Sequence, residues 1–374
     1  MAATSILTGD SYTAKLYATK GWIQAMQQSV CGMLFNKGGV YFPPELMGAD
    51  NRGDQLTFNY FGKLNNAPIG EGETADGNEE AVQIKTHSMV MNETRIPVLI
   101  PNYGIEKQRL KQNLETIVTG QIANRAVELM DTSVFTQLAG VNQTSFTLNG
   151  TTYSTTAKKL HVQGHNTPVA PTTNRIVRAA GAATDQALTS SDTFTLALID
   201  YALEKNAVSD QPIEPMNDGY FYLFLSPYDV TNLKHDAGSA IQWLNLQTAM
   251  ISGGKASQVE GEYVNNIPYL GVYNNVKIFQ AGRVAYGQNS STSAVITTVR
   301  RNVLVGKNAL SFASPYGGRV SDTDVPFRFQ EQLKDYGKYK GILAEMVYGL
   351  KKMSPTDKED IGSFVIGTYA ASHA

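Results

Sequence analysis

The hydrophobic pattern between Gly53 and Gly140 changes its period once, and this change constrains the fold more than any other feature of the chain. Just after Gly53, alternate positions are apolar, which predicts a strand with one buried face: Leu56, Phe58 and Tyr60. A second limb starts with the same alternation at Val82-Gln83-Ile84-Lys85 and reaches Ile100, and its Pro97 indicates a sheet edge or a strand end. The two limbs predict one long β-hairpin. Because a two-stranded ribbon is marginal in water, we expect it to lie on its own domain or on another copy of the chain.

The connection between the limbs, residues 65–81, is acidic and has no periodicity. It contains five acids and no base: Glu71, Glu73, Asp76, Glu79 and Glu80. A structureless loop of this length is usually functional or disordered. The Asp-x-Asp-x-Asp-Gly order of a calcium loop is missing, so the interpretation is a solvated acidic tip rather than a cation site.

After Gly104 the apolar residues recur every three or four positions, which predicts an amphipathic helix. The apolar stripe comprises Leu110, Leu114, Ile117, Val118, Ile122, Ala126, Leu129 and Met130. Gly140 is a suitable helix stop. A helix from about Gln108 to Leu138 would span roughly 45 Å at 1.5 Å per residue and could serve as a spine.

The remaining segments divide into an arm and two structured regions. Residues 1–52 are too short and irregular for a core of their own, and Phe42-Pro43-Pro44 forces extended chain. Residues 141–299 predict α/β structure, with Asp192 as the N-cap of a helix, a strand at Tyr220–Leu225, a helix starting at Ser226-Pro227, a helical stretch at Ala240–Ile251 and a strand at Val276–Phe279. Further strands are predicted at Asn302–Val305, Phe327–Gln330, Gly341–Leu350 and Ser363–Tyr369.

Composition excludes several classes of protein. The chain has 374 residues, a formal charge of −2 and 17% charged residues, so it lacks the basic excess of a duplex-DNA reader. The pairs Arg300-Arg301 and Lys351-Lys352 are interpreted as solvated or interfacial. A single cysteine, Cys31, excludes an intrachain disulfide framework and is interpreted as a buried small hydrophobe. The N-terminus lacks a signal-peptide pattern and the chain has no run of eighteen apolar residues, so we expect neither secretion by a signal nor a membrane span.

No catalytic or metal-binding pattern stands out. The Gly253-Gly254-Lys255 run departs from the phosphate-loop spacing. His161 and His165 are four residues apart, but a glycine between them indicates non-helical chain, so metal ligation is not expected. We therefore expect no enzyme activity, no catalytic residue, no metal and no cofactor.

An ordered set of segments resembles the N4-type major capsid proteins of tailed bacteriophages, which have the Hong Kong 97 capsid fold. The resemblance covers roughly residues 20–370 and is carried by Gly53 to Phe58, Glu71 to Ala81, Arg95, the Gln108–Leu138 helix with Ala126 and Asp131, Leu188 to Asp192, Pro215 to Pro227, Leu233 to Asp236, Val305 to Ala309, Asp335 to Gly337 and Tyr348 to Lys352. Residues 141–180 and 284–299 fit the family pattern poorly.

The resemblance implies an α+β fold with four parts. These are an N-terminal arm at 1–52, an extended β-hairpin (E-loop) at 53–101, a peripheral domain with the spine helix at 102–140 and 300–374, and an axial domain at 141–299. It also implies a shell protein that self-assembles into pentamers and hexamers of an icosahedral virion capsid, in the host bacterial cytoplasm. The implied partners are other copies, a portal, scaffolding protein and, in some shells, decoration proteins, and the enclosed double-stranded DNA would not be bound sequence-specifically.

Two other functions stay open from sequence. An encapsulin-like nanocompartment shell would share the fold and enclose an enzyme, and a cytosolic enzyme could combine the α/β region with a lid-like hairpin. For a shell, we expect contacts between subunits at the five acids of the tip, at Lys107, Arg109 and Lys111, and at Trp22 and Phe35 of the arm. Lys351 and Lys352 are second-choice receptors for the tip, since the return limb should deliver the hairpin beside the first group.

Overall fold

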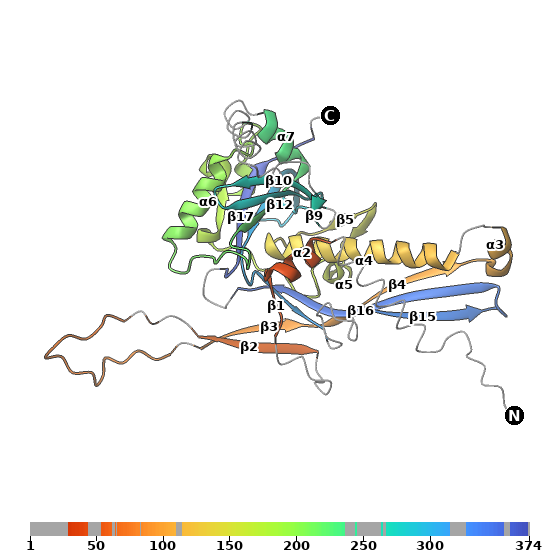
Figure 1. Cartoon of the computed structure of the whole chain (residues 1–374), viewed down its shortest axis with the longest axis horizontal. Helices are drawn as coiled ribbons and strands as arrows, with labels where there is room; N and C mark the ends of the chain where they lie inside the picture. The colour runs from red at the N-terminus through yellow and green to blue at the C-terminus, as the bar shows by residue number, and fades with distance from the viewer. Residues whose placement is uncertain are drawn as a thin grey trace.

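A computed structural model describes most of the chain. The described residues are 29–43, 54–61, 64, 66–82, 84–109, 114–235, 244, 263–264, 267–314, 327–354 and 360–372. Two larger sheets lie on either side of a long helix, and a hairpin projects from the end of one sheet (Figure 1). The expected helix at 240–251 lies almost wholly outside the described residues.

The first sheet has five strands organised around β16, Tyr339–Lys352. β15 (Phe327–Lys334) and β4 (Asn92–Ile100) flank it antiparallel along one part of its length. β14 (Leu310–Ala313) pairs antiparallel with the other end, and β1 (Val40–Tyr41) pairs parallel with β14. Pro97 lies in β4, which pairs only with β16 among the described strands, as the edge prediction required.

The second sheet has eight strands in the order β7-β17-β13-β8-β11-β10-β9, with β12 paired to β13. Their bounds are β7 Ile176–Arg178, β17 Ser363–Tyr369, β13 Val295–Val305, β8 Phe221–Leu225, β11 Val276–Gln280, β10 Ile267–Tyr273, β9 Tyr263–Val264 and β12 Tyr286–Gln288. Two two-stranded ribbons have no strand pairing with either larger sheet among the described residues. One consists of β2 (Gln55–Phe61) and β3 (Ile84–Val90), and the other of β5 (Phe146–Leu148) and β6 (Thr151–Tyr153).

The helices are α2 Val30–Lys37, α3 Tyr103–Arg109, α4 Leu114–Leu138, α5 Thr156–His161, α6 Ala197–Val208 and α7 Pro227–His235. Short 3₁₀ turns occupy Thr173–Arg175, Ala179–Gly181 and Asp185–Ala187. The strand predictions at 220–225, 276–279 and 363–369 agree with β8, β11 and β17 to within one residue, and α7 begins at the predicted Pro227.

Helix α4 is the 25-residue spine between the sheets. Its stripe Val118, Ile122, Ala126 and Met130 belongs to one core with β16 residues such as Ile342 and Met346 and with Phe224 and Phe279 of the second sheet. Gly140 ends it as predicted. Its φ is +61°, its N–H donates to Gln137 O at 3.1 Å, and the Val141 N–H donates to Thr136 O at 3.1 Å, which together form a Schellman motif.

The end of α4 is also held by a buried ion pair. Arg301 on β13 donates through Nη1 to Ala139 O at 3.1 Å and pairs through Nε with Asp185 at 2.7 Å. The Arg301 and Arg178 guanidinium groups keep the pKa of Asp185 below its usual range. The interpretation of Arg300-Arg301 as solvated or interfacial is therefore wrong, because both side chains are buried within the subunit.

Part of the predicted arm is core. Helix α2 starts at the N-cap Ser29, whose Oγ accepts the Gly32 N–H at 2.9 Å, and five of its apolar side chains are buried: Val30, Cys31, Met33, Leu34 and Phe35. β1 follows it into the five-stranded sheet. The interpretation of residues 1–52 as an arm that packs on other copies is wrong for residues 30–41, which contribute to the subunit core. They share a hydrophobic core with α4 and β14, which are distant in sequence, so the local pattern does not reveal these partners.

Two further expectations need correction. Asp192 does not cap α6, which starts five residues later; its carboxylate instead accepts the Thr189 N–H at 2.7 Å in a local turn. The expected boundary between residues 299 and 300 falls inside β13, and β13 and β17 both belong to the eight-stranded sheet. Residues 300–374 therefore contribute to both sheets, because the chain leaves the second sheet at the end of β13, Val305, and enters the first sheet at β14.

Candidate inter-subunit interface

The projecting hairpin is shorter than the predicted one. β2 and β3 pair from Gln55↔Val90 to Phe61↔Ile84. The chain then leaves the ribbon at Met91, and β4 pairs with β16 instead of with β2. The return limb predicted as far as Ile100 therefore belongs partly to the body, where β16 offers a long partner strand that the local sequence pattern could not show.

One face of the hairpin base rests on the five-stranded sheet. Phe58 is 7% exposed and lies 5.4 Å, between ring centroids, from Tyr41. Leu56 packs against a small apolar cluster of Met89, Met91 and Ala313. The alternation predicted for β2 is confirmed, since Gln55, Thr57 and Asn59 are exposed while Phe58 is buried.

In β3 the buried and exposed positions are the reverse of those expected from the sequence, where Val82 and Ile84 were on the apolar face. Lys85, His87 and Met89 are buried, whereas Ile84 is 61% exposed and Val82 just before the strand is 59% exposed. The cross-strand register decides this, because Phe58 pairs with His87 and directly opposed residues share a face. Apolar side chains of β3 are thus available on the outer surface of the hairpin.

The acidic loop is exposed, and three of its carboxylates form internal hydrogen bonds. Glu80 accepts the Asn66 N–H at 2.8 Å, Glu73 accepts the Gly70 N–H at 3.0 Å, and Glu79 accepts the Gly77 N–H at 2.8 Å. These bonds give the loop a defined shape. Glu71 and Asp76 are exposed and are not used in this way.

The acidic loop and the predicted basic receptor lie at opposite ends of the molecule. In Figure 1 the loop reaches the left end of the long axis, whereas α3 and the turn between β15 and β16 form the right end. The expectation that the return limb delivers the hairpin beside the receptor is wrong, because β4 runs away from the hairpin towards α3. Any contact between the two ends must join different copies of the chain.

The far end carries a second element that the sequence analysis missed. The Tyr103 N–H of α3 donates to Lys338 O at 2.9 Å, which places α3 next to the β15–β16 turn. In this turn Lys334 and Lys338 are exposed, with Asp335 between them, and Tyr336 is 110% exposed beside Leu333 at 62%. The only sequence signal was Asp335-Tyr336-Gly337 between two strands, since all three residues have a positive φ typical of a tight turn.

The other predicted contact residues have mixed positions. Arg109 is exposed at the end of α3, Lys107 lies in α3, and Lys111 and Trp22 are outside the described residues. Phe35 is 9% exposed and packs on Phe42 and Phe312 at centroid distances of 5.0 and 4.9 Å, so the expected contact with a neighbour is wrong for Phe35.

The second-choice receptor is also engaged within the subunit, where Lys352 is buried and Lys351 half-buried. Lys352 is fully buried and pairs with Asp360 at 2.7 Å, and Lys351 donates to Ser88 O at 2.5 Å. Neither lysine presents a free cation to another copy.

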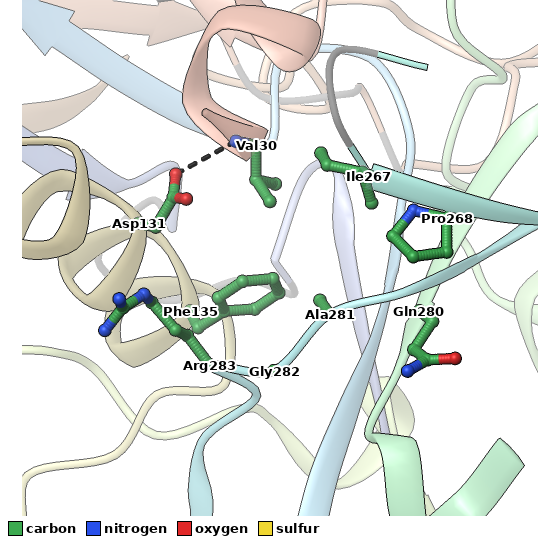
Figure 2. A pocket seen from close by; sticks show the side chains of 9 residues that line it. All are labelled: Val30, Asp131, Phe135, Ile267, Pro268, Gln280, Ala281, Gly282 and Arg283. Carbon is green, nitrogen blue, oxygen red and sulfur yellow. Dashed lines mark hydrogen bonds between the residues drawn. The ribbon is translucent and has the colours of Figure 1, made fainter. Parts of the chain in front are cut away.

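A cavity of about 420 Å³ lies between α2, α4 and the ends of β10 and β11 (Figure 2). On its wall, Asp131 of α4 accepts the Val30 N–H at 2.9 Å and the Cys31 N–H at 3.4 Å, so its carboxylate caps α2. Burial raises the pKa of Asp131 to about 7, and burial followed by the Asp131 charge raises the pKa of the Cys31 thiol. Cys31 is thus an unreactive core thiol, and we interpret the Asp131 contact as structural.

Metal and membrane sites are not apparent. No group of three histidine, cysteine, aspartate or glutamate side chains is placed to hold a metal in the described part of the chain. Among the helices described, none has the length and apolarity needed to cross a membrane.

The long spine helix, the projecting hairpin and the two sheets define the Hong Kong 97-type capsid fold, and comparison with solved structures supports this class. The capsid of Ralstonia phage GP4 is similar with a TM-score of 0.70 and 18% identity over 100% of both chains. The capsid asymmetric unit of cyanophage Pam1 is similar with a TM-score of 0.61 and 16% sequence identity, and the match covers 90% of both chains. The head structure of Helicobacter pylori bacteriophage KHP40 is similar with a TM-score of 0.57 and 12% sequence identity, and the match covers 99% of this chain and 94% of that one.

Sequence comparison identifies the family. The profile of the phage capsid protein family matches residues 46–372, which is most of the chain. The chain belongs to the phage capsid protein family and is a major capsid protein, whose copies form an icosahedral shell. A search of curated proteins finds no matching sequence. The family match favours the phage capsid over the encapsulin-like alternative, and the N4-type subgroup stays a prediction.

Proposed function

We propose that copies of this chain form the pentamers and hexamers of the capsid by head-to-tail contact, with the acidic loop of one copy on the α3 and β15–β16 end of the next. The observation that carries the proposal is the position of the two surfaces at opposite ends of the long axis. A surface that meets a different surface on the next copy forms a heterologous interface, and such interfaces form rings when the rotation between copies closes.

The charges and the apolar residues support this pairing. The loop carries five acids and no base. The other end offers exposed Arg109 in α3, which also contains Lys107, and adds exposed Lys334 and Lys338 around Tyr336. Asp335 and Glu106 reduce the positive charge there, so electrostatics select orientation while Leu333 and Tyr336 provide apolar area.

Each contact is weak by itself. An exposed ion pair contributes about 0.2–1 kcal/mol and is screened by salt. Because the contact recurs in every copy, a ring of five or six multiplies this small contribution. Assembly of the parent protein is therefore expected to weaken as salt concentration rises.

The test is a double variant, Glu71→Lys with Asp76→Lys, which keeps the three carboxylates that shape the loop. Negative-stain microscopy and light scattering should show that the purified variant forms far fewer shells or rings than the parent at low salt. The matched control is Glu204→Lys with Glu214→Lys, an equal charge change on exposed residues outside the loop. Equal assembly of the loop variant and the parent would refute the contact, as would equal loss in the control.

The wider role is also a proposal. We infer assembly in the host cytoplasm with portal and scaffolding proteins, a double-stranded DNA genome held without sequence-specific binding, and no catalytic role. The slight negative charge and the burial of Arg300, Arg301 and Lys352 support weak interaction with DNA. Particles purified from infected cells should contain DNA of genome length. Particles that contain a cargo enzyme instead would favour a nanocompartment.

A further inference from the structure

The place where the β2–β3 hairpin leaves the body is held by a turn from a distant part of the chain. We call this place the hairpin joint; it comprises Val90 to Thr94 and the turn at 161–166. Asn166 accepts the Val90 N–H through Oδ1 at 2.8 Å and donates through Nδ2 to Val90 O at 3.0 Å. The same turn is fixed to β16, because the Leu350 N–H donates to Gly164 O at 2.9 Å.

Two histidines of this turn meet on one hydroxyl of β4. Thr94 Oγ1 lies 3.0 Å from His161 Nδ1 and 2.9 Å from His165 Nε2. The His165 ring also contacts Tyr348 of β16, with centroids 5.1 Å apart. His165 is 5% exposed, and its second ring nitrogen, Nδ1, is buried without a hydrogen-bond partner among the residues that the structure describes.

This geometry assigns the protons. An N–H without an acceptor costs more than a lone pair without a donor, so His165 carries its proton on Nε2 and donates it to Thr94 Oγ1. The Thr94 hydroxyl can then donate to His161 Nδ1. A second proton on His165 would have to sit on the partnerless Nδ1, and the neutral ring is therefore the form that fits the joint.

A third histidine lies on the hairpin side. His87 of β3 is 2% exposed, its Nε2 is 3.1 Å from Ser311 Oγ of β14, and its ring lies 5.0 Å from that of Phe58. Lys351 of β16 places a positive charge near His87. The backbone of Ser354 is the other hydrogen-bonding neighbour of His87. Three of the five histidines of the chain thus lie where the hairpin meets the body.

We propose that the hairpin joint, together with His87, is an acid-sensitive latch. Neutral His87 holds β3 on β14, neutral His165 holds on β4 the turn whose Asn166 binds Val90, and protonation of the two histidines releases the hairpin. The groups that face them are Ser311, Phe58, Lys351 and Ser354 around His87, and Thr94, His161 and Tyr348 around His165. None of these is a carboxylate, and Lys351 and His161 oppose further positive charge. Acid therefore adds charges that the closed joint does not compensate.

The direction of the pH effect follows from the buried state of both rings. Burial lowers the pKa of His87 and of His165 to about 4, with Lys351 and His161 as the second causes, whereas a released imidazole titrates near 6.5. The closed joint thus loses stability as the pH falls from 6.5 towards 4. Each histidine is expected to reduce the closing constant by about 20-fold at pH 5 relative to pH 7.

Hydrogen exchange of the full chain tests the latch. Protection factors, corrected for the intrinsic pH dependence of exchange, are measured at pH 7 and pH 5 for peptides that cover β3 and β17. We expect protection in β3 to fall at least about tenfold while protection in β17 stays nearly constant. In the double variant His87→Gln with His165→Gln, which cannot take up these protons, the fall in β3 should largely disappear.

The controls separate the latch from a general acid effect. His235→Gln alters an exposed histidine at the end of α7 and should behave as the parent does. Protection of β17 at pH 7 shows whether each variant folds. If the double variant does not fold, the pKa values of the histidines in the parent protein are measured by NMR titration. The proposal requires a pKa well below 6 for His87 and for His165. Unchanged β3 protection at pH 5, or values near 6.5, would overturn it.

Discussion

At the scale of single residues, the backbone requirements of the spine helix decide which side chains fit. Gly120 lies within α4 and Gly140 just past its end, and they meet different surroundings. Gly140 has a φ of +61° and faces Val169 O and Pro171, whereas a Cβ at Gly120 would have nothing within 4 Å. The two glycines therefore have opposite energetic roles.

Gly140→Ala should lower the free energy of unfolding. A left-handed alanine costs about 1–2 kcal/mol, and the clash with Val169 O adds to this. Gly120→Ala is the matched control and should raise stability by roughly 0.5–1 kcal/mol, because alanine is the better helix former. Urea unfolding of the unassembled subunit, followed by circular dichroism, measures both. A neutral effect at Gly140 would contradict the Schellman end.

Asp131→Asn should change how stability depends on pH. Burial raises the pKa of Asp131 to about 7 in the folded state, above its ordinary value of 3.8. The native state therefore holds a proton that the unfolded state releases, so the stability contribution of this group falls as pH rises from about 4 to 7 and is level above 7. The slope is of order 1 kcal/mol per pH unit.

The amide oxygen that this substitution introduces can still accept the Val30 N–H, so the variant should fold. Relative to the parent, the variant is expected to gain stability at pH 8 and lose it at pH 5, and thermal unfolding at the two pH values measures this difference. An identical pH dependence in parent and variant would show that Asp131 is ionised throughout.

At the scale of elements, α2 shows that a segment predicted as an arm can be core. Its five buried apolar side chains lie on α4 and β14. At about 1.5–3 kcal/mol for each large buried side chain, this contact is comparable with the whole stability of a domain. The hairpin is the opposite case, since it keeps apolar side chains such as Ile84 exposed.

Truncation distinguishes the two parts of the N-terminal segment. A chain that starts at residue 29 should retain native circular dichroism and a cooperative melting transition. A chain that starts at residue 41 lacks α2 and should be unfolded or aggregated, because α4 and β14 lose their apolar cover. Native melting of the shorter chain would mean that α2 is dispensable for folding.

At the scale of the whole molecule, the elongated shape places complementary surfaces at opposite ends. Because the two surfaces lie at opposite ends of one chain, they can meet only between different copies. This arrangement predicts that two variants, each defective alone, can restore contact when they alternate around a ring.

The first variant is Glu71→Lys with Asp76→Lys, and the second is Lys334→Glu with Lys338→Glu. Each alone should weaken its own contacts, because the introduced lysines face lysines and the introduced glutamates face acids. In a mixture the two introduced lysines of one variant face the two introduced glutamates of the other. Hexamers permit perfect alternation, but a pentamer leaves one mismatch. Mass photometry of the mixture should therefore show recovery of six-membered rings over five-membered ones. Recovery without this preference, or none, would count against the head-to-tail contact.

Local periodicity determined much of this protein before any tertiary contact was known. The period of two in β2, the period of 3.6 in α4 and the glycine stop at residue 140 depend on neighbours in the chain, so they can be read from residues alone. The acidity of the 65–81 loop is equally local. The ordered resemblance to capsid proteins also pointed to the family that the profile match established.

Only the tertiary structure decided which segments share a sheet, which face of β3 is buried, and which charges are available to another copy. β4 pairs with β16 instead of extending the hairpin, and Phe35 packs on Phe312. Lys352 forms an ion pair with Asp360, and the turn at 161–166 binds Val90, which is more than seventy residues away in sequence. These outcomes depend on partners far away in sequence. Their physical cause is burial and hydrogen bonding between distant segments, which no window of local pattern contains.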